Sequence, residues 1–337
     1  MFDITPTLNT QKEISMPPKK STAMKVLLTN DGSPQSRVAS QFMQNLTFPP
    51  GISLYLLKVI DGPDTQRSRT TGRSIKSFQT QEMNEARELM ERQSQNLATP
   101  TQPVTPLVSR GVPGGVILST IDKYDIDLVI LGTHGRKGIN RFLLGSVSEW
   151  VLSEAPCSTL IVRPTTHVKK SKAKGLRILF ASDGSPDAKT AINFLHLIDF
   201  PQPPRLTILH VVKKHFYQTP QLVTTTRQSP TDMDSLAKDL LKERGLKGTQ
   251  LLHDIRSKFA DKGWNLTEHL AFGSEADEIL KCAKRTRADL VVLGSRGMTS
   301  MRKLLLGSVS NKVVRHAPCS VLVIRKPSNV TISQRKK

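Results

Sequence analysis

The chain has 337 residues, a formal net charge of +21 and 37% hydrophobic residues. That length and composition exclude a wholly disordered chain and predict two globular domains. No apolar run reaches the roughly 18 residues of a membrane span, and residues 1–20 lack the apolar stretch of a secretory signal. Three cysteines cannot form a disulfide framework. We therefore expect a cytoplasmic protein.

Two short segments concentrate the positive charge. Residues 164–175 and 326–337 each carry a net charge of +4, and neither contains an aromatic residue. We interpret them as solvated connectors. The alternative is a nonspecific contact with nucleic acid or with an anionic membrane surface.

The sequence contains two copies of one unit. Residues 24–35 (MKVLLTNDGSPQ) return as 176–187 (LRILFASDGSPD), 127–148 return as 289–310, and APCSTLIVR at 155–163 returns as APCSVLVIR at 317–325. Three matched blocks in the same order indicate a duplication. The predicted organisation is a flexible arm (1–23), a first domain (24–163), a basic linker (164–175), a second domain (176–325) and a basic tail (326–337).

Short apolar runs predict five strands in each unit. They are residues 25–29, 53–59, 103–108, 127–132 and 158–162, and then 177–181, 205–211, 265–271, 289–294 and 320–324. Several runs are continuously apolar, as in parallel sheets buried on both faces. Apolar residues at helical spacing indicate helices over 86–97 and 251–259, with Gly245 and Gly248 expected to break or end the helix before the second of these. Alternating strands and helices predict a doubly wound α/β fold with a ligand crevice at the carboxyl ends of the strands.

Asp31 and Asp183 follow the first strand of each unit, and each precedes Gly-Ser-Pro. One interpretation is a turn or a helix N-cap, because an Asp carboxylate accepts hydrogen bonds from nearby backbone amides. The other is a polar contact to a nucleotide or to its Mg²⁺, which takes carboxylate and phosphate oxygens. The spacing alone does not separate the two.

A glycine pattern, G-x2-G-x9-G-S, starts at the end of the fourth strand of each unit. It consists of Gly132, Gly135, Gly145 and Ser146, and again of Gly294, Gly297, Gly307 and Ser308. The final Gly-Ser opens an amphipathic segment, and the N-terminus of a helix offers unpaired N–H groups to phosphate. The serine adds a hydroxyl donor or caps the helix. The identical spacing in both copies predicts a phosphate-binding turn.

Other residues near this pattern differ in their expected roles. His134 stands where the second copy has Arg296, and we interpret His134 as a turn residue. Cys157 and Cys319 precede a buried strand and are expected to be small buried side chains rather than redox groups. The cations between the glycines are expected on a solvated loop face, with phosphate contact as the alternative: Arg136, Lys137, Arg141, Arg302 and Lys303.

Together, the D-G-S turn, the DLVILGTHG segment, the glycine spacing and the A-P-C-S-x-L-I-V block resemble the universal stress protein family, in tandem over both units. The resemblance implies two Rossmann-like domains of the adenine nucleotide alpha hydrolase type, each with a five-stranded parallel sheet and helices on both faces. One branch of that family binds ATP through this glycine motif, and another lacks both the motif and the nucleotide. Both units here resemble the ATP-binding branch.

The resemblance also implies site residues by position. Asp31 and Asp183 would lie near the base, sugar and metal of the nucleotide, and Val59 and Val211 would line the adenine pocket. The ribose and phosphates would be held by Gly132, Gly135, Gly145, Ser146 and Val147, and in the second unit by Gly294, Gly297, Gly307, Ser308 and Val309. The implied cofactors are ATP and Mg²⁺, with Asp31 and Asp183 as the carboxylates that contact the metal.

Three functions follow from these features. The first is a nucleotide-binding regulatory protein of the stress response. The second is an ATPase or phosphoryl-transfer enzyme, although the sequence has no G-x4-G-K-[ST], H-R-D or D-F-G motif and no evident base, so we expect slow hydrolysis at most and assign no catalytic residue. The third is a basic nucleic-acid-associated protein, and it rests on the net charge alone.

The last strand of each unit predicts how the two domains associate. Residues 158–162 and 320–324 are apolar, and an unpaired edge strand of that composition tends to associate. A linker raises the effective concentration of the two copies. We therefore expect a compact pseudo-two-fold pair within one chain, joined at these strands, with a homodimer as a further layer.

Overall fold

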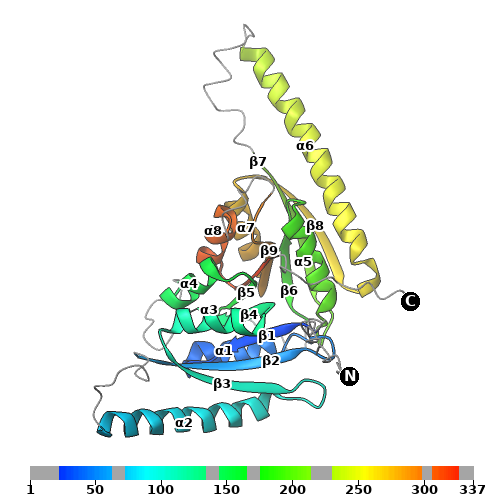
Figure 1. Cartoon of the computed structure of the whole chain (residues 1–337). Helices are drawn as coiled ribbons and strands as arrows, with labels where there is room; N and C mark the ends of the chain where they lie inside the picture. The colour runs from blue at the N-terminus through cyan, green and yellow to red at the C-terminus, as the bar shows by residue number, and fades with distance from the viewer. Residues whose placement is uncertain are drawn as a thin grey trace, which may run out of the picture.

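One continuous sheet runs through both repeats (Figure 1). The computed structural model describes residues 23–62, 73–133, 144–164, 175–213, 230–297 and 306–325. Within these residues ten strands lie in the order β3-β2-β1-β4-β5-β10-β9-β6-β7-β8. They are β1 (Lys25–Thr29), β2 (Ser53–Asp61), β3 (Val104–Gly111), β4 (Leu128–Gly132), β5 (Ser158–Val162), β6 (Arg177–Ala181), β7 (Arg205–Lys213), β8 (Asn265–Gly273), β9 (Leu290–Gly294) and β10 (Ser320–Ile324).

All strand pairs within a repeat are parallel, so each repeat is a five-stranded parallel sheet with the order 3-2-1-4-5. Helices connect the strands, and the predicted α/β fold class is confirmed. The helices are α1 (Pro34–Met43), α2 (Arg73–Leu97), α3 (Pro113–Tyr124), α4 (Ser146–Glu154), α5 (Pro186–Leu197), α6 (Pro230–Lys258), α7 (Glu275–Arg285) and α8 (Ser308–His316), with a short 3-10 turn, η5 (Ala260–Lys262).

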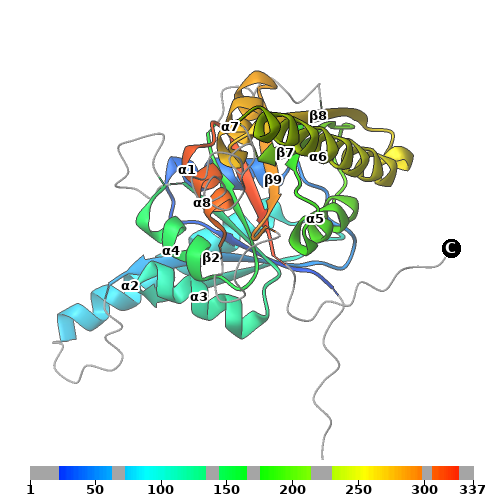
Figure 2. The same ribbon diagram turned by 90° about the horizontal axis from the view of Figure 1, so that it is seen from above.

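The sheet is covered on both faces, and each face has its own apolar core (Figure 2). Successive residues of a strand point to opposite faces. In β1, for example, Val26 and Leu28 join the core beneath α1, α2, α5 and α6, whereas Leu27 joins the core beneath α3, α4, α7 and α8. This alternation explains why the strands read as continuously apolar runs.

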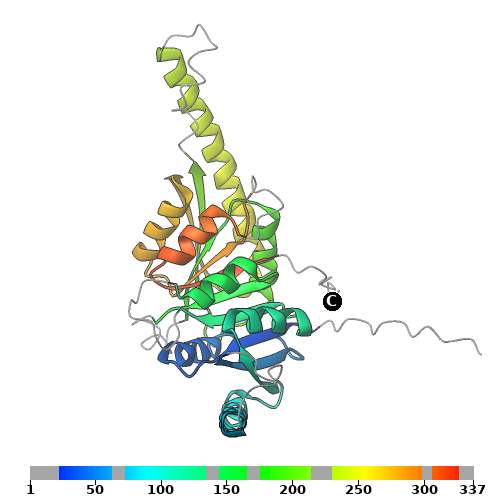
Figure 3. The ribbon, with the colours of Figure 1, turned by 60° about the vertical axis from the view of Figure 1, so that its left-hand side comes forward.

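The two repeats meet at β5 and β10, which pair antiparallel. Leu160 pairs with Leu322, and these two residues occupy equivalent positions in the repeats, so the pseudo-two-fold axis passes between them. A second bridge joins Thr47 to Asp199, again at equivalent positions, through two backbone hydrogen bonds of 2.7 and 2.8 Å. The predicted pairing of the final strands within one chain is confirmed, and each repeat covers the edge strand of the other. Figure 3 shows the first repeat below the second.

The prediction that Gly245 and Gly248 interrupt a helix is wrong. Helix α6 runs without a break from Pro230 to Lys258, and both glycines are buried on the side that faces β7 and β8. A Cβ at Gly248 would lie 2.8 Å from His210 Cδ2 and 2.8 Å from Leu270 Cδ1. Gly248 therefore lets a long helix approach the sheet closely, and the packing of α6 on the sheet outweighs the low helix propensity of both glycines.

The two glycines of α6 give a matched test of this explanation. Gly245→Ala should raise the free energy of unfolding by about 0.5–1 kcal/mol, because alanine is the better helix former and the nearest atom to its Cβ, Phe272 Cζ, lies 3.4 Å away. Gly248→Ala should instead lower it by about 1–2 kcal/mol, because His210 and Leu270 must move. Urea denaturation of both variants measures the difference, and a change of the same sign in both would contradict the explanation.

Candidate functional site

The candidate site of each repeat lies where the strand order reverses, between β1 and β4 in the first repeat and between β6 and β9 in the second. In open parallel sheets this switch point is where ligands bind, outside the carboxyl ends of the strands. Asp31 follows β1 and Gly132 ends β4, while Asp183 follows β6 and Gly294 ends β9. The predicted residues of each repeat therefore come from neighbouring strands.

The Asp-Gly-Ser-Pro segments form the turn that starts the first helix of each repeat. Asp31 Oδ1 accepts a hydrogen bond from Ser33 N at 2.9 Å, and Asp183 Oδ1 accepts one from Ser185 N at 3.0 Å. The following serine is the N-cap of α1 or α5, and the proline opens the helix. Both aspartates therefore have the turn-forming role that the sequence suggested as one of two alternatives. Asp31 is half-buried and Asp183 is exposed at this edge.

The first glycine of each pattern allows the strand end to approach a helix N-terminus. A Cβ at Gly294 would lie 2.9 Å from Asp187 Cβ and 3.0 Å from Ala188 N, and one at Gly132 would lie 3.1 Å from the backbone of Gln35. A Cβ at Gly297 would lie 2.9 Å from Asp183 Oδ2, which brings the second glycine turn against that carboxylate. Gly135, its counterpart in the first repeat, lies outside the described residues.

The last part of the pattern begins α4 and α8. Gly145 and Gly307 are the N-cap residues, and neither helix has a hydrogen bond from a capping side chain. Ser146 and Ser308 are the first helical residues and are exposed, so the interpretation of these serines as caps is wrong. The first N–H groups of an α-helix have no partner within the helix, and they carry the positive end of its dipole.

Short hydrogen bonds fix both helix N-termini to the preceding strand. Gly145 N donates to Thr133 O at 2.7 Å, and Ser148 Oγ donates to Gly132 O at 2.7 Å. In the second repeat the corresponding bonds run to Ser295 O and Gly294 O, at 2.8 Å each. The N-terminal turns of α4 and α8 are therefore held at the carboxyl edge of the sheet, in the same geometry in both repeats.

The predicted apolar residues share one face of the sheet. Val59 and Val147 are half-buried and pack against the core beneath α3 and α4, and Val211 and Val309 do the same in the second repeat. Val59 and Val211 lie two residues before the ends of β2 and β7. An apolar wall of each candidate site thus stands beside the uncapped helix N-terminus.

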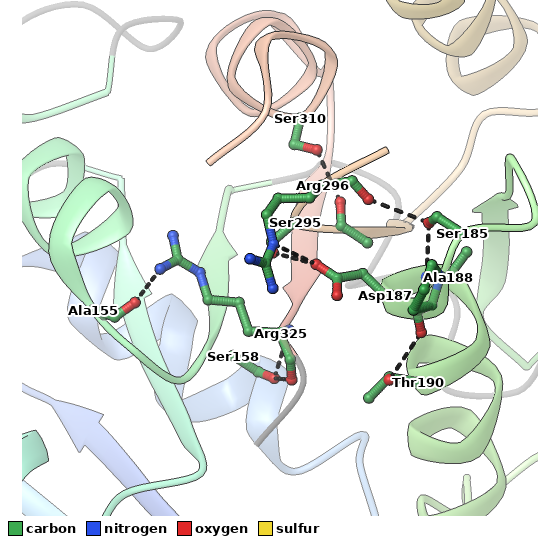
Figure 4. A network of polar contacts seen from close by, with 12 residues as sticks. Ala155, Ser158, Ser185, Asp187, Ala188, Thr190, Ser295, Arg296, Ser310 and Arg325 are labelled. Atoms are coloured by element: carbon green, nitrogen blue, oxygen red, sulfur yellow. Dashed lines mark hydrogen bonds and ion pairs between the residues drawn. The ribbon is translucent and has the colours of Figure 1, made fainter. Parts of the chain in front are cut away.

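The second repeat contains a buried polar network that the sequence did not predict (Figure 4). Asp187 is 5% exposed, and its Oδ2 accepts hydrogen bonds from Ser295 Oγ at 2.7 Å and from Arg296 Nε at 3.3 Å. Ser185 Oγ also donates to Arg296 O at 3.2 Å. The sequence signals were two differences between the copies, Gln35 against Asp187 and His134 against Arg296. This network anchors the Ser295–Arg296 turn to α5.

Several predicted loop residues fall outside the described part of the chain, namely His134, Arg136, Lys137, Arg141, Arg302 and Lys303. Their expected roles stay predictions. Within the described residues, no group of three or more His, Cys, Asp or Glu side chains could hold a metal ion.

A surface hollow of about 420 Å³ lies away from both candidate sites. Its lining is His253, Arg256, Ser257, Ala260, Trp264 and Leu266. Trp264 and Leu266 stand at the start of β8, whereas the candidate sites lie at the carboxyl ends of the strands. The hollow contains none of the predicted site residues.

Cys157 and Cys319 lie apart from the chemistry of either site. Both are buried, as the sequence predicted, and burial raises the pKa of each thiol to about 12. The reactive form of cysteine is the thiolate, so these thiols are inert in the folded protein at neutral pH.

The comparisons with known proteins agree with this architecture. A family model described as the universal stress protein family matches the chain twice, over residues 23–163 and 176–325. The chain therefore belongs to the universal stress protein family and contains it in tandem. Universal stress protein YxiE of Bacillus subtilis (strain 168) is 32% identical over 149 residues, which is 44% of this chain and 98% of that protein.

Two further matches extend this picture. Universal stress protein MJ0531 of Methanocaldococcus jannaschii is 36% identical over 92 residues, 27% of this chain and 52% of that protein. The crystal structure of a universal stress protein from Archaeoglobus fulgidus DSM 4304 matches with a TM-score of 0.55 and 21% identity, over 90% of this chain and 97% of that one. The latter likeness concerns the fold and extends across both repeats. Among helices in the described residues, none combines the length and apolar character needed to cross a membrane.

The buried thiols predict an alkaline loss of stability. In the unfolded chain a thiol ionises near pH 8.5, whereas folded Cys157 and Cys319 keep their protons up to about pH 12. Above pH 8.5 the folded state binds more protons, so stability falls as pH rises, by about 2 kcal/mol per thiol at pH 10. In a Cys157→Ala, Cys319→Ala double variant, the free energy of unfolding should decrease less steeply between pH 8 and pH 10. Equal slopes for variant and wild type in urea titrations at pH 8–10 would refute it.

Proposed function

We propose that this protein is a nucleotide-binding regulatory protein of the stress response, with one ATP site in each repeat. The observation that carries the proposal is the pair of helix N-termini without side-chain caps, at Gly145 and Gly307, each held against the end of a parallel strand. Backbone N–H groups and the positive end of a helix dipole at a switch point favour a phosphate group. Membership of the universal stress protein family supports the same role.

The residues of each site divide into three groups by chemistry. Val59 and Val211 offer apolar contact for an adenine ring from the ends of β2 and β7. The glycines at the strand end, with Gly135 and Gly297, allow a ribose and phosphates to approach the backbone. The first turns of α4 and α8, with Ser146 and Val147 or with Ser308 and Val309, supply N–H and hydroxyl donors to the phosphates and apolar contact beside them.

The described carboxylates fit a Mg²⁺ ion that is brought by the nucleotide. Mg²⁺ keeps several waters and commonly takes one or two carboxylates together with substrate phosphates. Asp31 and Asp183 each place a single carboxylate at the edge, with Oδ1 bonded to the turn amide. When bound, the ion would neutralise phosphate charge, while these carboxylates orient it.

Calorimetry with ATP tests the number of sites. The wild-type chain should bind close to two ATP per chain, because the same geometry occurs in both repeats. Gly145→Val and Gly307→Val should each reduce the stoichiometry by one, since a branched side chain at the N-cap would crowd the phosphates. Arg205→Gln, at the start of β7 and therefore at the opposite edge of the sheet, should keep two sites. A wild-type stoichiometry near one would mean that one repeat is structural only.

Hydrolysis should be slow, because each repeat offers a single candidate metal-contacting carboxylate, and the other carboxylate near the second site, Asp187, already accepts hydrogen bonds from Ser295 and Arg296. We expect steady-state turnover below about 1 s⁻¹, at the lower limit of typical enzymes. Asp31→Ala and Asp183→Ala should weaken binding in Mg²⁺ and leave binding in a chelator unchanged, whereas the exposed Asp261→Ala should have no effect. Turnover far above this limit would favour the enzyme over the regulatory protein.

A further inference from the structure

The residue that follows the last strand of each repeat is a buried arginine that contacts the other repeat. Arg163, after β5, is 4% exposed, and Arg325, after β10, is 5% exposed. Arg163 Nη2 donates to Val314 O at 2.7 Å and to Arg315 O at 3.2 Å, in the last turn of α8. These two arginines occupy equivalent positions in the repeats.

Arg325 makes the reciprocal contact. Its Nη1 donates to Ala155 O, at the carboxyl end of α4 (Figure 4). Its Nη2 donates to Leu152 O of the same helix at 2.8 Å. The arginine backbones are held as well, because Arg163 N donates to Ser320 Oγ and Arg325 N donates to Ser158 Oγ, at 3.2 Å each. Each arginine is thus bonded to both the last strand and the last helix of the opposite repeat.

The helices that receive these contacts are the two that begin at the candidate phosphate sites. Helices α4 and α8 have nine residues each, which corresponds to a length of roughly 13 Å. The last carbonyl groups of a helix have no partner within it, and a cation there interacts favourably with the dipole. A short helix moves as one body, so its carboxyl end and its phosphate-facing end shift together.

Burial of these two arginines carries an electrostatic cost. Burial lowers the pKa of both guanidinium groups, and Nε of each has no hydrogen-bond partner among the described residues. Neither arginine forms an ion pair within the described part of the chain, and the charges that act on Arg325 include Arg296 and Asp187 of the second site and Glu154 of α4. The bonds from each guanidinium group to the last carbonyls of the opposite helix offset part of the cost of burying its charge.

We propose that Arg163 and Arg325 are positioning residues that act across the boundary between the repeats. Arg163 of the first repeat holds the phosphate-facing helix of the second site, and Arg325 of the second repeat holds that of the first site. Each nucleotide site is then complete only when both repeats are paired. The inference rests on the proposed ATP sites, and it assigns to each of them a residue from the other repeat.

A crossed binding experiment on the full chain tests the proposal. Gly145→Val leaves only the second site for ATP, and Gly307→Val leaves only the first. In the first background Arg163→Gln should weaken ATP binding roughly three- to tenfold, because the helix is no longer preorganised, and Arg325→Gln should change it less than about twofold. In the second background the two arginine variants should exchange these effects. The exposed Arg205→Gln, which removes the same charge, should affect neither site.

The proposal is overturned if an arginine variant weakens ATP binding at the site of its own repeat, weakens binding equally at both sites, or leaves binding unchanged. Arg163→Lys and Arg325→Lys repeat the experiment with the charge retained. Lysine lacks the planar fork that reaches two carbonyls, so these variants should lie between wild type and the glutamine variants. They also decide the question if a glutamine variant does not fold.

Hydrogen exchange of the full chain without nucleotide separates this proposal from the proposed function. Arg163→Gln should accelerate amide exchange in α8 and leave α4 unchanged, and Arg325→Gln should do the reverse. If wild type binds no ATP, the proposed function fails, while crossed exchange would still assign the arginines to the opposite helices. If wild type binds two ATP and exchange is not crossed, the arginine proposal fails and the proposed function stands.

Discussion

The antiparallel pairing of β5 with β10 is the contact on which the rest of the structure depends. It converts two five-stranded parallel sheets into one sheet of ten strands, and it covers the edge strand of each sheet, which is buried along its whole length. Because the register places Leu160 opposite Leu322, the backbone of each repeat meets equivalent positions of the other. The Thr47–Asp199 bridge and the Arg163 and Arg325 contacts follow this rule.

The same backbone geometry is stabilised by different side chains in the two repeats. In the second repeat the turn after β9 is tied to α5 through Asp187, Ser295 and Arg296, whereas the first repeat has Gln35 and Thr133 at two of these positions. Similarly, Trp150 packs over Gly114 between α4 and α3, while its counterpart Lys312 forms an ion pair with Asp277 at 2.7 Å. The fold therefore tolerates changes in anchoring residues as long as the strand ends and helix N-termini stay in place.

The features predicted from the sequence are those that local pattern determines. Strands such as 25–29 and 320–324 are short, continuously apolar runs, a pattern that indicates burial on both faces of a parallel sheet. The strands and their parallel pairing within each repeat could therefore be predicted. The glycine pattern could likewise be placed at the carboxyl edge. The error at Gly245 and Gly248 has a different origin, since helix propensity describes an isolated helix, whereas Gly245 packs against Phe272 and Gly248 against His210 and Leu270. Asp187 and the two arginines were missed because their partners lie more than 100 residues away.

Because the two repeats are fused into one chain, a contact between them can form on one side of the junction only. In a symmetric dimer of identical subunits the same contact would occur twice. Glu149 of α4 forms an ion pair with Arg315 of α8 across the boundary, while the equivalent positions are Asn311 and Ser153 and carry no charge. At the strand pair, Thr159 lies opposite Val323, and the equivalent of Thr159 in the second repeat is Val321. The buried Thr159 hydroxyl has no partner among the described residues, so this half of the junction carries a polar group that the other half lacks. Because each half occurs once, one side can change without the other, and the two proposed sites can diverge in affinity while the backbone of the junction stays symmetric.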